Sequence, residues 1–347
     1  MSQNFRLENG GLINRNKKIS FKFNGKTYFG YEGDTLASAL IANGVHLIGR
    51  SFKYHRPRGF LGVGVEEPNA MVQLHEGDRS EPNIMATEVE LVEGLVANSQ
   101  NCWPSVKFDI GEINNLLNRF FPAGFYYKTF MWPKSFWYKI YEPVIRKAAG
   151  MGIAPLNPDP DRYEHNYEHC DVLVVGSGPS GLASALAAAK NGARVILAED
   201  KAHFGGSLLN DDVTIGNMSG REWASDVISQ LKNLPNVVVK NRSQVFGYYD
   251  HNMTVMFERV SDHIENPSQY TPRQRLHYIR AGEVIVSTGS IERPISFGNN
   301  DRPGILLASA AREYMKVYET LVGKKPIIFT NNDTAYSTAL EFLKNDI

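Results

Sequence analysis

Three glycines at fixed spacing carry the clearest chemistry in this sequence. Gly176, Gly178 and Gly181 stand in "GSGPSG", after an apolar run and before a segment of small residues. In this pattern the first glycine permits a tight turn, the second lets the main chain approach a diphosphate, and the third lets a helix pack close to a strand. Unpaired amides at the start of that helix attract an anion. The spacing predicts a loop that binds the pyrophosphate of a dinucleotide, against the plainer alternative of a structural glycine-rich turn.

The segments around the loop agree with this prediction. Residues 172–175 read as a buried strand and residues 182–191 as a helix. A second strand at 195–197 leads to Glu199, which lies 23 positions after the first glycine. An acid at this place accepts hydrogen bonds from ribose hydroxyls. Because a carboxylate repels a 2′-phosphate, NAD or FAD is expected rather than NADP.

Two other glycine-containing turns are candidates for main-chain contacts with the nucleotide. Gly205 and Gly206 in "HFGGSLL" follow closely behind the acid. The strand expected at 283–287 stops at Thr288 and Gly289, where a small residue lets the chain pass close to a cofactor. An ordinary turn at the end of a strand is the alternative for this second place.

Arg58 is a candidate from outside this region, because arginine is well suited to gripping a phosphate. It stands in the basic stretch "KYHRPRG", which a solvated loop explains equally well. The histidines His165 and His169 would share a face only if their segment were helical, and a metal site there is not favoured. No catalytic acid or base can be assigned from spacing. The candidate cofactor-binding residues are Gly176, Ser177, Gly178, Pro179, Ser180, Gly181, Glu199, Asp200, Lys201, Gly205, Gly206, Ser207, Thr288, Gly289 and Arg58.

Composition argues against several classes of function. The chain has 347 residues and 42% hydrophobic content, which is enough for two domains. Basic and acidic residues each number 37, so no net positive charge favours nucleic acid as a partner. No apolar run approaches the length of a membrane span, and the N-terminus has no apolar core of a secretory signal. A cytoplasmic protein is therefore expected.

The cysteine count bears on redox chemistry. Cys102 and Cys170 are the two cysteines of the chain, and they are too few for a disulfide framework. An iron–sulfur cluster is held by cysteine thiolates, typically four. A cluster built from this chain alone, or any other metal site, is therefore not expected.

The N-terminal region reads as a small β-rich domain with one helix, over residues 1–100. Alternating apolar and polar residues surround Asn24-Gly25, a pair typical of a tight hairpin. A helix is expected to begin at Asp34 or Thr35 and to end near residue 43. A strand near residue 97 would close the domain.

A dense aromatic segment lies in the connecting region, residues 101–165. Eleven aromatic residues fall between Phe120 and Tyr141. Their rings either fill a seam between two domains or form an exposed face for another subunit. A stretch rich in proline and aspartate at 155–162 then marks a boundary. The nucleotide-binding domain is expected at 166–325, with antiparallel strands forming an excursion from its parallel sheet.

The last stretch, residues 326–347, repeats the skeleton of the glycine loop without its glycines. Thr330 and Asn332 stand where the first two glycines would be, and Ala335 stands at the third. A strand and a helix of a second nucleotide-binding fold are expected here. One such pair cannot cover a sheet, so the sequence is interpreted as an N-terminal fragment or a piece of a longer polypeptide.

These features together resemble a known family. The pattern from Gly176 to Glu199, with the later strand end at Gly289, resembles the two-dinucleotide-fold flavoproteins. The stretches "SFKYHRPRGFLGVGVEEPNAMV", "AGFYYKTFMWP", "FGGSLL" and "TNNDTAYSTAL" are similar to the alpha subunits of heterotetrameric sarcosine oxidases. The resemblance implies an α/β Rossmann-like domain preceded by a small ferredoxin-like α+β domain. Related ferredoxin-like domains carry cluster cysteines around "GFLGVGVEEPNA", whereas Gly62, Val63 and Gly64 here offer no ligand.

The resemblance also implies an activity for the whole complex. Such complexes demethylate sarcosine to glycine, pass the one-carbon unit to tetrahydrofolate and pass electrons through flavins to oxygen. The alpha subunit would hold NAD at the glycine loop, with FAD on a beta subunit, FMN at their interface, and small subunits completing the hetero-oligomer. The alternatives are a non-catalytic scaffold that holds NAD, a subunit of a dye-linked dehydrogenase for secondary amines, opines or proline with FAD at the loop, and a free-standing NAD-dependent dehydrogenase.

Overall fold

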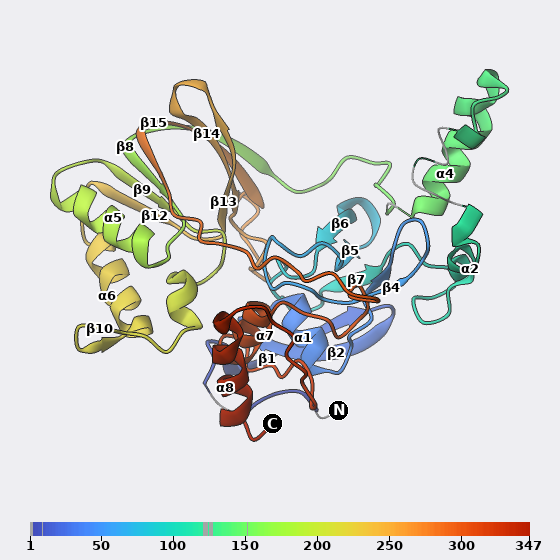
Figure 1. Cartoon of the computed structure of the whole chain (residues 1–347). Helices are drawn as coiled ribbons and strands as arrows, with labels where there is room; N and C mark the ends of the chain where they lie inside the picture. The colour runs from blue at the N-terminus through green and yellow to red at the C-terminus, as the bar shows by residue number, and fades with distance from the viewer. Residues whose placement is uncertain (1–2, 9, 121–123, 125–127, 151) are drawn as a thin grey trace. The chain divides into compact units, whose positions relative to one another are not determined.

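The computed structural model describes residues 3–347 except 9, 121–123, 125–127 and 151. The chain divides into two compact units. Unit 1 comprises Met1–Pro160 together with Arg293–Ile347, and unit 2 comprises Asp161–Glu292. Each unit contains its own β-sheet (Figure 1).

A five-stranded sheet organises unit 1. Its strand order is β2-β1-β7-β5-β6, in which β1 and β7 are parallel and the other neighbours are antiparallel. The strands are β1 (Asn14–Phe23), β2 (Lys26–Glu32), β5 (Met71–Leu74), β6 (Glu81–Met85) and β7 (Val96–Ser99), and a separate ribbon consists of β3 (Gly49–Arg50) and β4 (Pro57–Arg58). This sheet corresponds to the small β-rich domain that the sequence predicts.

Local sequence rules account for the first hairpin and the helix after it. Strands β1 and β2 join through Asn24 and Gly25, whose φ angles of 51° and 72° are those of a tight hairpin turn. Helix α1 (Leu36–Ala42) begins after Thr35, and the side chains of Thr35 and Ser38 cap each other's backbone amides. Both sequence predictions are confirmed.

The remaining elements of unit 1 are short helices. They are α2 (Ile113–Leu116), α4 (Glu142–Ala149), α7 (Ala308–Lys316) and α8 (Tyr336–Lys344), with single turns at Gly77–Arg79, Ile110–Glu112, Asn118–Phe120, Lys134–Phe136, Trp137–Tyr141 and Asp333–Ala335. Helix α7 has one fully buried ring, that of Tyr314. The hydroxyl of this ring donates a hydrogen bond to the carbonyl of Gly62.

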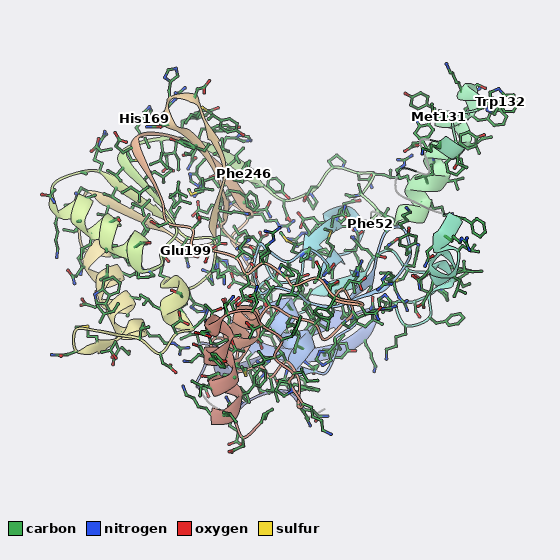
Figure 2. All side chains as sticks on the ribbon, viewed as in Figure 1. Phe52, Met131, Trp132, His169, Glu199 and Phe246 are labelled. Atoms are coloured by element: carbon green, nitrogen blue, oxygen red, sulfur yellow. The ribbon has the colours of Figure 1, made fainter. Side chains whose placement is uncertain are left out.

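Large apolar side chains of the aromatic segment are exposed. Trp132 and Tyr138 are each 83% exposed, and Phe120 is 74% exposed. Trp132 and Met131 project from the chain in Figure 2. These rings therefore do not pack into the core of their own unit, and both interpretations of the segment stay predictions. Part of the segment, 121–123 and 125–127, lies outside the described residues.

The C-terminal stretch forms only half of the strand and helix expected from its sequence. Residues 326–330 pair with no strand among those described, and Ile327 is 93% exposed. The expected helix is present as α8, whose Phe342 is buried against Met315 of α7. A strand needs a neighbour for its main-chain hydrogen bonds, whereas a helix satisfies its own, and this explains why only the helix forms.

A six-stranded sheet forms the centre of unit 2. Its order is β12-β9-β8-β15-β14-β13; the first four strands are parallel, and β14 and β13 form an antiparallel hairpin. The strands are β8 (Tyr163–Val175), β9 (Val195–Ala198), β12 (Val237–Lys240), β13 (Ser243–Tyr249), β14 (Met253–Arg259) and β15 (Gln274–Val286), and a small pair consists of β10 (Thr214–Ile215) and β11 (Met218–Ser219). The parallel sheet with an antiparallel excursion confirms the prediction.

Two helices pack side by side on this sheet, α5 (Pro179–Lys190) and α6 (Gly220–Lys232) (Figure 1). Their shared core includes Leu182 and Ala185 of α5, Val227 of α6 and Leu197 of β9, all buried. Burial of each leucine or valine side chain contributes about 1.5–3 kcal/mol. The packing fixes the end of β8 against the start of α5, where the glycine loop lies.

Strands β8 and β15 are longer than predicted, and a charged network around the buried His277 lies in their additional, polar halves. Strands β8 and β15 have 13 residues each. The two ring nitrogens of buried His277 lie 2.6 Å from Glu168 and 2.7 Å from Glu258, and Lys240 lies 3.8 Å and 3.7 Å from the same carboxylates. Burial lowers the pKa of His277, but the two carboxylates outweigh it and raise the pKa overall. These contacts pair the polar halves of the strands.

Candidate functional site

Two glycines of the loop are required by the protein's own atoms. Gly176 has a φ of +95°, and a Cβ there would lie 2.4 Å from the carbonyl oxygen of Ser287. A Cβ on Gly181 would lie 2.0 Å from the carbonyl oxygen of Gly176. Neither position has room for a side chain, in agreement with the tight turn and the close helix packing that the spacing predicts.

Gly178 is different, because the protein does not fill the space beside it. Its φ of −66° suits any residue, and no described atom lies within 4 Å of where a Cβ would be. Helix α5 begins directly after it with Pro179 as the first residue and without a side-chain cap. The first amides of a helix have no partner within the helix and carry partial positive charge. Open main chain beside uncapped amides fits a diphosphate.

Hydrogen bonds connect three of the predicted segments: the glycine loop at Ser177, the chain at Glu199–Lys201 and the turn at Gly205. The Oε2 of Glu199 accepts hydrogen bonds from the Ser177 amide, at 2.9 Å, and from the Ser177 hydroxyl. The Ser177 Oγ accepts one from the Gly205 amide at 3.1 Å, and the Glu199 Oε1 accepts one from the Lys201 amide at 3.1 Å. Glu199 lies just beyond the end of β9 (Figure 2). The fold thus brings together four of the residues that the sequence predicts as contacts of a nucleotide.

The second glycine pair lies against the first loop. Gly206 has a φ of +52°, and a Cβ on it would lie 2.9 Å from the Cα of Gly178. Ser207 follows in a short helical turn, Gly206–Leu209. The close approach of Gly206 to Gly178 places this turn beside the start of α5.

The chain after β15 also reaches the loop. The Ser287 amide donates to the carbonyl of Val175 at 2.7 Å, which continues the pairing of β15 with β8. Thr288 and Gly289 follow, and Gly289 has a φ of +71°. Thr288 and Gly289 therefore lie at the carboxyl end of β8, next to Gly176, where ligands bind in sheets of this type. Their passage close to a cofactor stays a prediction.

Arg58 belongs to unit 1, whereas the hydrogen bonds around Glu199 lie within unit 2. Its guanidinium contacts the carboxylate of Asp301 and donates to the Asp301 carbonyl at 2.9 Å, and Arg56 donates to the same carboxylate at 2.7 Å. A hydrogen bond from Arg56 is the main reason why the pKa of Asp301 lies well below its usual value. Arg58 as a phosphate ligand stays a prediction.

Two arginines that sequence reasoning missed hold the chain after Glu199. The Arg259 guanidinium donates to the carbonyl of Asp200 at 2.6 Å, and the Arg242 amide donates to the carbonyl of Lys201 at 3.0 Å. Both belong to the antiparallel excursion or the turn before it. Their distance along the chain hides them, because no local pattern links them to the end of β9.

The histidine pair belongs to a strand. His165 and His169 lie in β8 with exposed side chains, so the helical arrangement that would pair them does not form. Within the described residues, no group of three or more His, Cys, Asp or Glu side chains is arranged to hold a metal ion. No helix in that part of the chain is both long enough and apolar enough to span a bilayer.

Glu199→Gln should flatten the pH dependence of stability in unit 2. Burial, followed by the adjacent Asp200, raises the pKa of Glu199 from 4.5 to about 8. The folded protein therefore binds this proton more tightly than the unfolded chain does. The stabilisation is fully present below pH 4.5 and is lost as pH rises through about 8.

Thermal unfolding measured across this pH window tests the effect. The surface variant Asp226→Asn is the control, because Asp226 is exposed on α6. We expect a smaller slope of melting temperature against pH in Glu199→Gln than in the wild type and the control. Equal slopes in all three proteins would contradict the assignment. The raised pKa of His277 acts in the same direction and is common to all three.

Comparisons with known proteins add independent findings. A family model described as "2Fe-2S iron-sulfur cluster binding domain" matches residues 16–102, and one described as "FAD dependent oxidoreductase" matches residues 171–241. The sarcosine oxidase subunit alpha of Rhizobium meliloti (strain 1021) is 53% identical over 97% of this chain and 34% of its own length. That of Corynebacterium sp. (strain U-96) is 33% identical over 96% of this chain and 30% of its own length. The chain thus spans about a third of these relatives.

A solved structure resembles the chain in fold. The L-proline dehydrogenase from P. horikoshii superposes with a TM-score of 0.64 over 99% of this chain and 54% of its own, at 19% sequence identity. At that identity the likeness concerns the fold alone. With the family models, it confirms a dinucleotide-binding α/β domain preceded by a ferredoxin-like β-rich domain.

Proposed function

The chain is related to the sarcosine oxidase alpha subunits over 97% of its length, and from this relationship we propose that it holds a dinucleotide within an amine-oxidising complex. The observation that carries the proposal is the open main chain at Gly178 beside the uncapped start of α5. A glycine that the protein's own packing does not require is explained by a ligand that needs the space.

Different residues of unit 2 would bind different parts of the dinucleotide. The amides at the start of α5, with Gly178, would receive the pyrophosphate. Glu199 and Asp200 would meet the adenosine ribose, and the turns at Gly205-Gly206 and Thr288-Gly289 would line the two sides of the loop. A bound dinucleotide of this kind supplies hydride or electron transfer. The chain's own contribution is to bind and orient it.

NAD is the proposed occupant, with FAD as the alternative. The acids at the ribose position, Glu199 and Asp200, can bind ribose hydroxyls and offer no cation to a 2′-phosphate, so NADP is not proposed. The match of residues 171–241 to a FAD-dependent oxidoreductase model supports FAD, whereas the relation to sarcosine oxidase alpha subunits supports NAD.

The proposed complex oxidises the C–N bond of sarcosine, and its electrons leave through flavins to oxygen. The amine pocket and a FAD would lie on a beta subunit, with FMN at the interface with it and small subunits completing a cytoplasmic hetero-oligomer. Glycine and a one-carbon unit on tetrahydrofolate would be the products. The exposed rings around Trp132 and Tyr138 are available for such a partner.

The test is the identity and behaviour of the ligand. The purified chain should release NAD on denaturation, identified by mass, and added NAD should raise its melting temperature in proportion to the logarithm of its concentration. Release of FAD with a flavin absorption band would favour a dye-linked amine dehydrogenase. Release of neither, together with no thermal shift from either, would overturn the proposal.

A scaffold role is separated from a redox role in the assembled complex. If the dinucleotide takes part in electron transfer, anaerobic sarcosine should change its absorbance. A dinucleotide that stays spectrally inert while the flavins bleach would indicate a structural ligand. Turnover of an amine by the purified chain alone would instead support a free-standing dehydrogenase.

A further inference from the structure

A second loop, in unit 1, gathers main-chain amides around a buried carboxylate. This loop, residues 61–70, lies between β4 and β5, at the place where related ferredoxin-like domains carry cluster cysteines. Glu67 within it is 2% exposed. The Glu67 Oε2 accepts hydrogen bonds from the amides of Leu61 (2.6 Å) and Gly62 (2.7 Å), and the Oε1 accepts from Asn69 (2.7 Å) and Ala70 (3.1 Å).

The neighbouring acid, Glu66, accepts hydrogen bonds from amides in the middle of the same loop. The Oε1 of Glu66 accepts hydrogen bonds from the amides of Val63 at 2.6 Å and Gly64 at 3.1 Å. Together the two carboxylates receive six amides from ten consecutive residues. Converging main-chain amides of this kind form an anion-binding concavity, and here the anions are side chains of the loop itself.

The carbonyl groups of the loop are bound as well. The Leu61 carbonyl accepts a hydrogen bond from the Leu307 amide at 2.9 Å, and the Gly62 carbonyl accepts one from the buried Tyr314 hydroxyl at 3.0 Å. The Gly64 carbonyl accepts one from the Thr87 hydroxyl at 2.9 Å. Both the amides and these carbonyl groups of the loop are therefore hydrogen-bonded to other atoms of the protein.

The residues present do not fit a 2Fe–2S group, although residues 16–102 match the family model for one. Such a cluster is held by four cysteine thiolates, and this region contains a single cysteine, Cys102. A Cβ on Gly62 would lie 2.5 Å from the Oε1 of Glu66. A side chain at that position would therefore displace the Glu66 carboxylate from the amides of Val63 and Gly64.

We propose that Glu67 takes the structural place of a cluster in this domain: its carboxylate is the buried anion around which residues 61–70 fold. In a cluster domain the sulfur atoms accept main-chain hydrogen bonds, and a carboxylate can accept about four such bonds. Glu67 thus stabilises the conformation of the loop in a domain that lacks the cysteines needed to bind a cluster. This role is independent of which dinucleotide unit 2 holds.

Hydrogen exchange of the full chain tests the role of Glu67. In the wild type we expect slow exchange of the amides of Leu61, Gly62, Asn69 and Ala70. Glu67→Gln keeps one acceptor oxygen but presents an NH₂ group to the remaining donors, so their exchange should become at least roughly tenfold faster. Glu76→Gln changes an exposed acid of the same unit and should leave these rates unchanged.

Two results would overturn the proposal. The first is a Glu67→Gln protein whose loop amides exchange as slowly as those of the wild type. If that variant does not fold, fast exchange of the same amides in the wild type would also contradict the proposal. The other is cluster formation: anaerobic treatment of the wild-type chain with ferrous iron, sulfide and a thiol should yield no stoichiometric 2Fe–2S absorption. One cluster per chain, formed beside a ferredoxin control, would show that the loop still holds metal.

Discussion

Gly178→Val should abolish retention of a bound dinucleotide while leaving unit 2 folded. The backbone at Gly178 is extended, with φ −66° and ψ −178°, and no described atom lies within 4 Å of the added Cβ. The protein therefore accepts the side chain. A diphosphate does not, because the valine methyls would occupy the space in which it approaches the first amides of α5.

The expected loss is large. Each hydrogen bond to a charged group contributes about 1.5–3 kcal/mol, so losing two amide–phosphate contacts costs about 3–6 kcal/mol. This corresponds to roughly a 10²–10⁴-fold weaker affinity. Calorimetric titration with NAD and FAD, together with the nucleotide content of the purified protein, measures it.

Gly323→Val is a matched control in unit 1. Gly323 also has open space around an added Cβ and no left-handed backbone, but it is not part of the loop. Wild-type affinity in this control and near-wild-type melting temperature in both variants would assign the loss to the loop itself. Full nucleotide stoichiometry in Gly178→Val would remove the site from the proposed place.

The sequence located the glycine loop because each of its requirements is local. A turn, a close approach and a helix start involve neighbouring residues, and the pattern of Gly176, Gly178 and Gly181 specifies all three. The same holds for the turn at Asn24 and the cap at Thr35. These features depend on backbone angles and on hydrogen bonds over two or three residues, which a sequence states directly.

The orientation of Glu199 could not be predicted in this way. The spacing identified the acid, but its burial and its contact with Ser177 depend on a serine 22 positions earlier and on the Gly205 turn. The raised pKa follows from that burial. Side-chain direction and desolvation are properties of packing, so the motif gives the residue and the fold gives its electrostatic state.

The polar first half of β8 could not be predicted as a strand from the sequence, for a related reason. The first half of β8, "YEHNYEH", has no apolar alternation, so only 172–175 read as a strand. Glu168 becomes acceptable there because His277 and Lys240 neutralise it from other strands. Likewise, the acids beside Gly62 are unremarkable in the sequence, and only the folded loop shows that Glu67 receives four amides.

Arg6→Met should strongly destabilise unit 1. The Arg6 guanidinium contacts the Asp34 carboxylate through two hydrogen bonds, at 2.7 Å and 3.0 Å, and donates to the Tyr318 carbonyl at 2.6 Å. The side chains of Arg6 and Asp34 are 4% and 0% exposed. Removing the arginine leaves a buried carboxylate without its cation, although the Tyr31 amide and the Ser38 hydroxyl still donate to it. Breaking a buried ion pair in this way costs about 3–5 kcal/mol. For a unit of this size, that corresponds to a melting temperature roughly 6–20 °C lower.

Lys17→Met supplies the contrast, because Lys17 and Glu32 form an ion pair at the same 2.7 Å but are 54% and 46% exposed. An exposed pair contributes about 0–1 kcal/mol, so its loss should barely shift the transition seen by scanning calorimetry. Adding Asp34→Asn to Arg6→Met removes the stranded charge and should recover part of the loss. If the two single variants melt alike, or if the double variant gains nothing, burial of the charge is not what makes the Arg6 contact strong.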